Sequence, residues 1–382
     1  MLATAVAASA QTGFGSIITS VLTNNGEVNA AVATEEAALA ASRAENSLPG
    51  AEVEFEHLWG ENASGNRYSA GVSQEFEMPW VYSARREANR ARTHALDYTK
   101  AAIMADKALS VKLLIIDIIN AQARLSFYEE LGRNLARIDS LTQRSFELGN
   151  ATVLDVRKLQ LSILDNNRSI DACRADLATL QATLRGQGAS FSGNEAMWQA
   201  YPPQSMAGAS TNPEDYYQYH LGRLNAEAAS QQAKAVRFQS WPTLSVGYRF
   251  SYEDRTNFHG FTVALRLPSY SQSQRRRVAE LTAQAIGNQY DYELNCAMAE
   301  TAGQAAAAQA LQRSIEEYSQ LSGDTSYLDL LHKAFVGGEM TVIDYINEIN
   351  IFRSARLSYL DLEYRYNLTL ARLNRYRSID FN

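Results

Sequence analysis

Residues 146–155 read FELGNATVLD, and residues 335–344 read FVGGEMTVID. The two segments align without a gap. The spacing between them also separates two further pairs of identical residues: Pro79 and Pro268, and Arg86 and Arg275. Three landmarks at one spacing indicate a tandem duplication, and a repeat of this kind dictates the fold.

Each quoted segment has the chemistry of a tight turn between two helices. Thr152 followed by Asp155 fits a capping box, in which threonine is the N-cap and the acid lies at the third helical position. Gly149 fits the end of the preceding helix, where glycine adopts the left-handed conformation. The second copy repeats this set as Gly338, Thr341 and Asp344. We therefore expect two equivalent helical tips.

The flanking sequence predicts very long helices. Residues 80–201 and 269–382 contain no proline, which helix interiors exclude. A helix of about 65 residues before each tip would span about 100 Å. After the first tip, apolar positions alternate at spacings of three and four, the pattern of a left-handed coiled coil: Val156, Leu159, Ile163, Asn166, Ile170, Cys173, Leu177, Leu180 and Leu184. Such helices should pack side by side as an elongated bundle.

Two segments, 51–78 and 241–268, alternate apolar and polar residues, which is typical of strands with two different faces. We expect one β-hairpin in each, with polar turns at 60–67 and 254–259. In the first hairpin five acids share the polar face: Glu52, Glu54, Glu56, Glu75 and Glu77. About ten alternating residues suffice to cross a bilayer, but four strands cannot close a barrel. The sheet is therefore either soluble or completed by other chains.

The composition excludes several functional classes. The chain has 382 residues and a net charge of -7, whereas nucleic-acid binding requires a basic face. With 2 cysteines and 5 scattered histidines it shows neither a disulfide framework nor a metal-ligand motif. No catalytic triad and no phosphate-binding loop appears, so we predict neither an enzyme nor a bound cofactor. No run of 18 apolar residues suggests a transmembrane helix.

The order of segments follows from the repeat. Residues 1–10 end in Ala-Ser-Ala, which resembles the end of a cleaved secretory signal. The expected segments are the signal remnant 1–10, an N-terminal segment with a short helix 11–50, hairpin 51–78, helical hairpin 79–187, a connector with a short helix 188–240, hairpin 241–268, helical hairpin 269–377 and a tail 378–382.

A secreted, duplicated chain of this order resembles the TolC family of outer-membrane efflux channels. The resemblance is carried by the two tips and by the final helix, 341–374. It implies an α plus membrane β-barrel fold in which three chains pool their strands into a twelve-stranded barrel, continued by a helical tunnel across the periplasm. A homotrimer in outer-membrane lipid would then dock on a periplasmic adaptor and an inner-membrane pump. The stretch FEMPWVYSARR at 76–86 is most similar to the heavy-metal efflux branch.

The resemblance also assigns roles to residues. The tip residues Gly149, Thr152, Asp155, Gly338 and Thr341 would meet the adaptor, and Asp344, Asn347 and Glu348 would line the periplasmic aperture. The acidic strand face would line the lumen and favour cations. Two plainer interpretations remain: the tips are only helix caps, and the acids only form a solvated face. The alternative function is a periplasmic coiled-coil adaptor or scaffold with a soluble sheet.

The two cysteines should stay unpaired even in an oxidising periplasm. If the tips lie at the same depth, Cys173 and Cys296 are about 27 Å apart along the helices. A disulfide requires Cα atoms within about 7 Å. Cys173 also occupies the coiled-coil seam, so we expect it to be buried and slow to react.

Overall fold

The computed structural model describes residues 14–44, 46–60, 65–191, 198–202, 204, 212–239, 241–253, 255–267, 270–322 and 326–376. The expected signal remnant 1–10 and tail 378–382 lie outside these residues, as does the landmark Pro268. The chain divides into two compact units. The first unit, here the tip unit, comprises the described residues up to 29 and those within 103–204 and 297–376. The second, here the sheet unit, comprises the described residues within 30–102 and 212–296.

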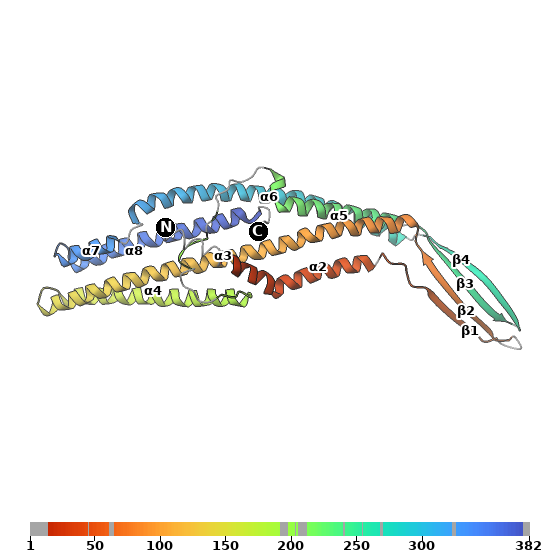
Figure 1. Ribbon diagram of the computed structural model, residues 1–382, viewed down its shortest axis with the longest axis horizontal. Helices are drawn as coiled ribbons and strands as arrows, with labels where there is room; N and C mark the ends of the chain where they lie inside the picture. The colour runs from red at the N-terminus through yellow and green to blue at the C-terminus, as the bar shows by residue number, and fades with distance from the viewer. Residues whose placement is uncertain are drawn as a thin grey trace. The chain divides into compact units, whose positions relative to one another are not determined.

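The elements occur in the expected order in both repeats (Figure 1). In the first repeat they are α2 (Gly26–Ala44), β1 (Glu52–Leu58), β2 (Arg67–Phe76), α3 (Pro79–Glu147) and α4 (Val153–Gly186). In the second they are η2 (Pro213–Asp215), α5 (Tyr217–Gln239), β3 (Thr243–Glu253), β4 (Thr256–Arg266), α6 (Tyr270–Ser322), α7 (Ser326–Val336), α8 (Val342–Leu373) and η3 (Asn374–Tyr376). Residues 14–24 are also helical.

The sheet unit contains one antiparallel sheet with strand order β1-β2-β3-β4. The register aligns the alternating residues, so that one row across all four strands is His57, Tyr68, Tyr252 and Asn257. The next row toward the helices is Phe55, Ala70, Phe250 and His259. The predicted separation into an apolar and a polar face is confirmed over most of the sheet, but at the start of β4 Phe258 lies on the polar face and Asn257 and His259 lie on the apolar face.

The second hairpin turn is shorter than predicted. Strands β3 and β4 pair as far as Glu253 and Thr256, so only residues 254 and 255 connect them. Arg255 has a φ of 63°, the left-handed value that two-residue hairpin turns favour. The expectation of a polar turn over 254–259 was wrong because residues 256–259, although mostly polar, pair in register with residues 250–253 of β3.

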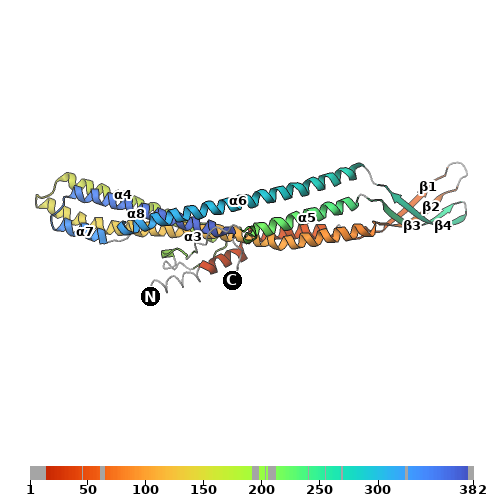
Figure 2. The same cartoon turned by 90° about the horizontal axis from the view of Figure 1, so that it is seen from above.

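In the tip unit, the helices pack side by side around two apolar clusters (Figure 2). The larger cluster joins the second half of α3 to α4, α7 and α8 and includes Leu131, Leu159 and Tyr345. The smaller one packs residues 14–24 and Trp198 against α3 and the end of α4, including Leu184. The predicted seam of α4 is confirmed, because Ile163, Ile170 and Cys173 pack on the first cluster and Leu177 and Leu180 on the second.

The long helical stretch of the second repeat is described in two parts. Whereas α3 runs for 69 residues, its counterpart comprises α6 with 53 residues and α7 with 11. Residues 323–325, which connect α6 to α7, lie outside the described residues. The expectation of one helix of about 65 residues therefore stays a prediction for this copy.

Both cysteines are free, as predicted. Cys173 is half-buried against the larger cluster, and burial raises the pKa of its thiol. Cys296 is exposed. Within the described residues, none of the helices combines the length and the apolar character that crossing a membrane requires.

Candidate functional site

The two tips have the same hydrogen-bonded geometry. In the first tip, the amide of Asp155 donates to the hydroxyl of Thr152 (3.2 Å), and the amide of Thr152 donates to the carboxylate of Asp155 (2.9 Å). Gly149 has a φ of 80°, and the amide of Asn150 donates to the carbonyl of Ser145 at 2.8 Å. These bonds form a complete capping box after a Schellman helix end.

The second tip repeats each of these bonds at the equivalent positions of the second copy. The Asp344 amide lies 3.2 Å from the Thr341 hydroxyl, and the Thr341 amide lies 3.3 Å from the Asp344 carboxylate. Gly338 has a φ of 76°. The hydroxyl of Thr341, and then its amide, hold the pKa of Asp344 below its usual value by stabilising the charged carboxylate. The capping interpretation of both motifs is confirmed, whereas adaptor docking stays a prediction.

The three predicted aperture residues have different surroundings. The Asp344 carboxylate is engaged in the cap, where the Thr341 hydroxyl donates to it at 2.7 Å. Asn347 lines a groove of about 370 Å³ between α4 and α8. Glu348 accepts a hydrogen bond from the Tyr327 hydroxyl of α7 at 2.9 Å. Their role at an aperture stays a prediction.

In the sheet unit, the polar face of the four strands bears charges of both signs. It carries five carboxylates, those of Glu52, Glu54, Glu56, Glu75 and Glu253, and three guanidinium groups, those of Arg67, Arg249 and Arg266. All three arginines form ion pairs across strands: with Glu253 at 3.6 Å, Glu54 at 2.7 Å and Glu75 at 3.0 Å, respectively. The polar face therefore keeps a net charge of about -2 per chain, well below the five negative charges that the sequence suggests.

A glycine lies between the partners of the central ion pair. Glu54 of β1, Gly71 of β2 and Arg249 of β3 lie in one row across the sheet. A Cβ atom on Gly71 would lie 3.8 Å from Nε of Arg249. The arginine extends across β2 to the glutamate two strands away, and a methyl group at position 71 would only be in ordinary van der Waals contact with it.

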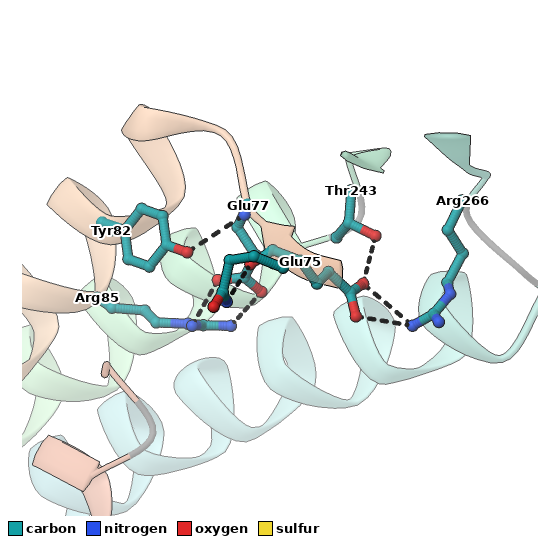
Figure 3. A network of polar contacts seen from close by, with 7 residues as sticks. Glu75, Glu77, Tyr82, Arg85, Thr243 and Arg266 are labelled. Atoms are coloured by element: carbon teal, nitrogen blue, oxygen red, sulfur yellow. Dashed lines mark hydrogen bonds and ion pairs between the residues drawn. The ribbon is translucent and has the colours of Figure 1, made fainter. Parts of the chain in front are cut away.

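A second polar network holds the end of the sheet that adjoins the helices (Figure 3). The Glu75 carboxylate accepts from the Thr243 hydroxyl at 2.6 Å and from Arg266. Glu77 lies beyond the last residue of β2, and Arg85 of α3 binds its carboxylate through two contacts of 2.6 Å. Both side chains of the Glu77–Arg85 pair are largely buried. This glutamate therefore connects the sheet to α3, and its predicted place on a lumenal face stays untested.

The opposite face of the sheet is apolar and exposed. Its exposed side chains include Val53 (78%), Phe55 (72%), Phe261 (83%) and Val263 (69%). Where the sheet joins the helices, the rings of Trp80 and Trp241 meet edge to face with centroids 5.3 Å apart. A continuous apolar face of this kind marks a surface that contacts lipid or protein.

Sequence reasoning did not find several contacts that the structure shows. Asn134 of α3 is buried, where it accepts from the Tyr345 hydroxyl at 2.9 Å. Asn166 donates to the carbonyl of Tyr128 at 3.0 Å, and a Cβ on Gly132 would come within 2.9 Å of its amide nitrogen. The polar Asn166 within the apolar seam was a signal for such a contact, since a buried amide requires a partner.

No family sequence model matches the chain, and no curated protein matches it by sequence. Solved structures do. The outer-membrane channel CmeC of Campylobacter jejuni superposes with a TM-score of 0.77 at 12% identity, covering 96% of this chain and 87% of that one. CusC, whose structures describe transmembrane channel formation, gives 0.75 at 16% identity, covering 94% and 91%. The outer-membrane protein VceC of Vibrio cholerae gives 0.75 at 14% identity, covering 95% and 96%.

The chain has the TolC fold. The likeness extends over nearly the whole of each chain, so that both repeats and both hairpins take part in it. At these sequence identities the likeness is one of backbone fold. The fold agrees with the family resemblance that the duplicated tips indicated.

Proposed function

We propose that the protein is the outer-membrane exit duct of a tripartite efflux system, acting as a homotrimer. In this assembly three four-stranded sheets would join edge to edge into a twelve-stranded barrel, and the helices would continue it as a tunnel into the periplasm. The duct would carry metal cations, drugs or other small solutes without catalysing a reaction.

The observation that carries this proposal is the sheet. Its strands of 7 to 11 residues separate an exposed apolar face from a charged face. The outermost strands β1 and β4 present their edges for pairing. An open edge and an apolar face both require a partner, and closure with further copies in lipid satisfies both requirements at once.

The helical tips support the second part of the proposal. Each is a turn closed by a capping box, with exposed apolar residues beside it, including Leu148 (72%) at the first tip and Val336 (60%) at the second. Such a surface suits docking of a periplasmic adaptor, which would connect the duct to an inner-membrane pump. Asp344, Asn347 and Glu348 would then face the aperture.

Fractionation and conductance test the proposal. The protein should leave the membrane fraction only with detergent and should migrate as a trimer that dissociates on heating. The purified trimer should form channels in a planar bilayer. A protein that is recovered in the soluble periplasmic fraction, and that forms no channels when well folded, would be a scaffold with a soluble sheet.

A further inference from the structure

The apolar face of the sheet ends in a row of hydrogen-bond donors at its turn end. This row, here the donor row, consists of His57, Tyr68, Tyr252 and Asn257, one residue from each strand in register. The four rows between it and the helices are mainly aliphatic or aromatic, with Gln74 and His259 as their polar members. A change from apolar rows to a complete row of donors marks a boundary between two environments.

The donor row is held in place by ring contacts. The His57 and Tyr68 rings stack at 4.3 Å with an angle of 8°, and Trp59 lies 4.5 Å from His57. Tyr68 and Tyr252 are both more than a third exposed. Among the residues that the structure describes, neither tyrosine hydroxyl has a hydrogen-bond partner, so both hydroxyls are available to a group outside the chain.

The spacing along the strands fits a membrane boundary. Along β2, Phe76 belongs to the last apolar row before the helices, and it lies eight residues after Tyr68. This is about 27 Å along a strand and about 21 Å along the membrane normal at a tilt of about 40°. Trp241 precedes Tyr252 by eleven residues. By the same conversion, these two residues are about 29 Å apart along the membrane normal. The apolar band of outer-membrane barrels is about 25 Å tall, so the donor row and the Trp80–Trp241 pair lie at its two edges.

We infer that the donor row binds the phosphate groups of the outer-leaflet glycolipid, lipopolysaccharide. This inference rests on the proposed function, because the turn end of the sheet faces outward only if the helices are periplasmic. The chemistry is complementary: phenol, amide and the neighbouring indole of Trp59 offer donors, whereas Nε2 of His57 is buried. The apolar face of the four strands includes no carboxylate that would repel an anion.

Lipid retention tests the inference. The trimer is reconstituted into phosphatidylcholine vesicles that contain a minor fraction of diphosphoryl lipid A, extracted in mild detergent, and its bound lipid A is measured by native mass spectrometry. The double variant Tyr68→Phe, Tyr252→Phe removes two hydroxyls and keeps both rings. Because a hydrogen bond to a charged group changes an equilibrium by about tenfold or more, we expect lipid A retention to fall by at least that factor.

Tyr248→Phe is the matched control. Tyr248 lies on the same face two rows nearer to the helices, and its hydroxyl already contacts Nδ1 of His259 at 2.6 Å. This variant should retain lipid A like the wild type. Equal retention by the double variant, or an equal loss by Tyr248→Phe, would overturn the inference.

Tryptophan quenching separates this inference from the proposed function. Brominated phosphatidylcholine should quench the exposed Trp59, Trp80 and Trp241 but not Trp198, which is 2% exposed in the tip unit. If none of the sheet tryptophans is quenched, the sheet does not insert and the proposed function fails. If they are quenched and lipid A retention is unchanged in the double variant, the donor row alone has been assigned wrongly.

Discussion

Cation preference of the duct should depend on two glutamates rather than on five. Glu54 and Glu75 are paired with arginines, whereas Glu52 and Glu56 form no ion pair among the described residues. A paired glutamate and arginine act as a dipole, whose field decays faster than that of a single charge. The net charge of about -2 per polar face becomes about -6 in a trimer, and it comes from the unpaired positions.

Two double variants distinguish these positions. Glu52→Gln with Glu56→Gln brings the polar face to a net charge of about zero. Glu54→Gln with Arg249→Gln removes one negative and one positive charge and leaves the net charge unchanged. The first change removes no ion pair among the described residues, and the exposed Glu54–Arg249 pair contributes only about 0–1 kcal/mol, so neither change should unfold the sheet.

The assay is the reversal potential of single channels in a KCl gradient. It should be run near 0.1 M salt or below, because the screening length is then about 10 Å or longer. The wild type should favour potassium, the first double variant should lose most of that preference, and the charge-balanced variant should keep it. Arg249→Gln alone should increase the preference. If the charge-balanced variant loses the preference as fully as the first, pairing does not determine selectivity and the reasoning is refuted.

Three further predictions concern the tip unit. Asp344→Asn should weaken block of the channel by divalent cations, while the matched Asp155→Asn, which changes an identical cap, should not; equal effects would restrict Asp344 to capping. Because capping lowers the pKa of both carboxyls in the folded chain, their contribution to stability is complete above the ordinary aspartate value of about 3.9 and is lost as the pH falls through the lowered pKa. The difference in Tm between wild type and Asp344→Asn should therefore stay constant from pH 8 to 5 and shrink only below about pH 4, and a decline near pH 6 would contradict this. Maleimide should label Cys296 rapidly and Cys173 only after denaturation, and equal rates would place Cys173 outside the seam.

The features that the sequence predicted are those that depend on near neighbours in the chain. A capping box involves residues three positions apart, and the two faces of a strand follow from alternation alone. Both could therefore be derived from residues such as Thr152 and Glu54 without knowledge of the fold. The duplication also predicted that the two halves of the chain contain the same elements in the same order, because the landmark residues are separated by the same spacing.

The ion pairs of the sheet could not be derived in the same way. That Arg249 is on the polar face follows from alternation, but its pairing with Glu54 depends on the register of three strands. A shift of one residue in any pair would move the partner to the other face. The apparent acidity of the first hairpin was therefore a property of one hairpin, and the second hairpin supplies the compensating arginines.

The duplication also limits what the tip motif can explain. Both copies complete the same capping box, so Thr152, Asp155, Thr341 and Asp344 are accounted for by the need to begin a helix after a tight turn. A function confined to one tip must depend on positions at which the copies differ. The positions of the first copy that correspond to Asn347 and Glu348 hold Lys158 and Leu159. Leu159 is fully buried in the apolar cluster, whereas Glu348 is hydrogen-bonded to Tyr327. The third and fourth residues after the cap aspartate are therefore among the positions at which the second tip differs chemically from the first, as are Glu339 and Ile346, which replace Asn150 and Arg157. An aperture in this chain would be built from Asn347 and Glu348 together with Asp344.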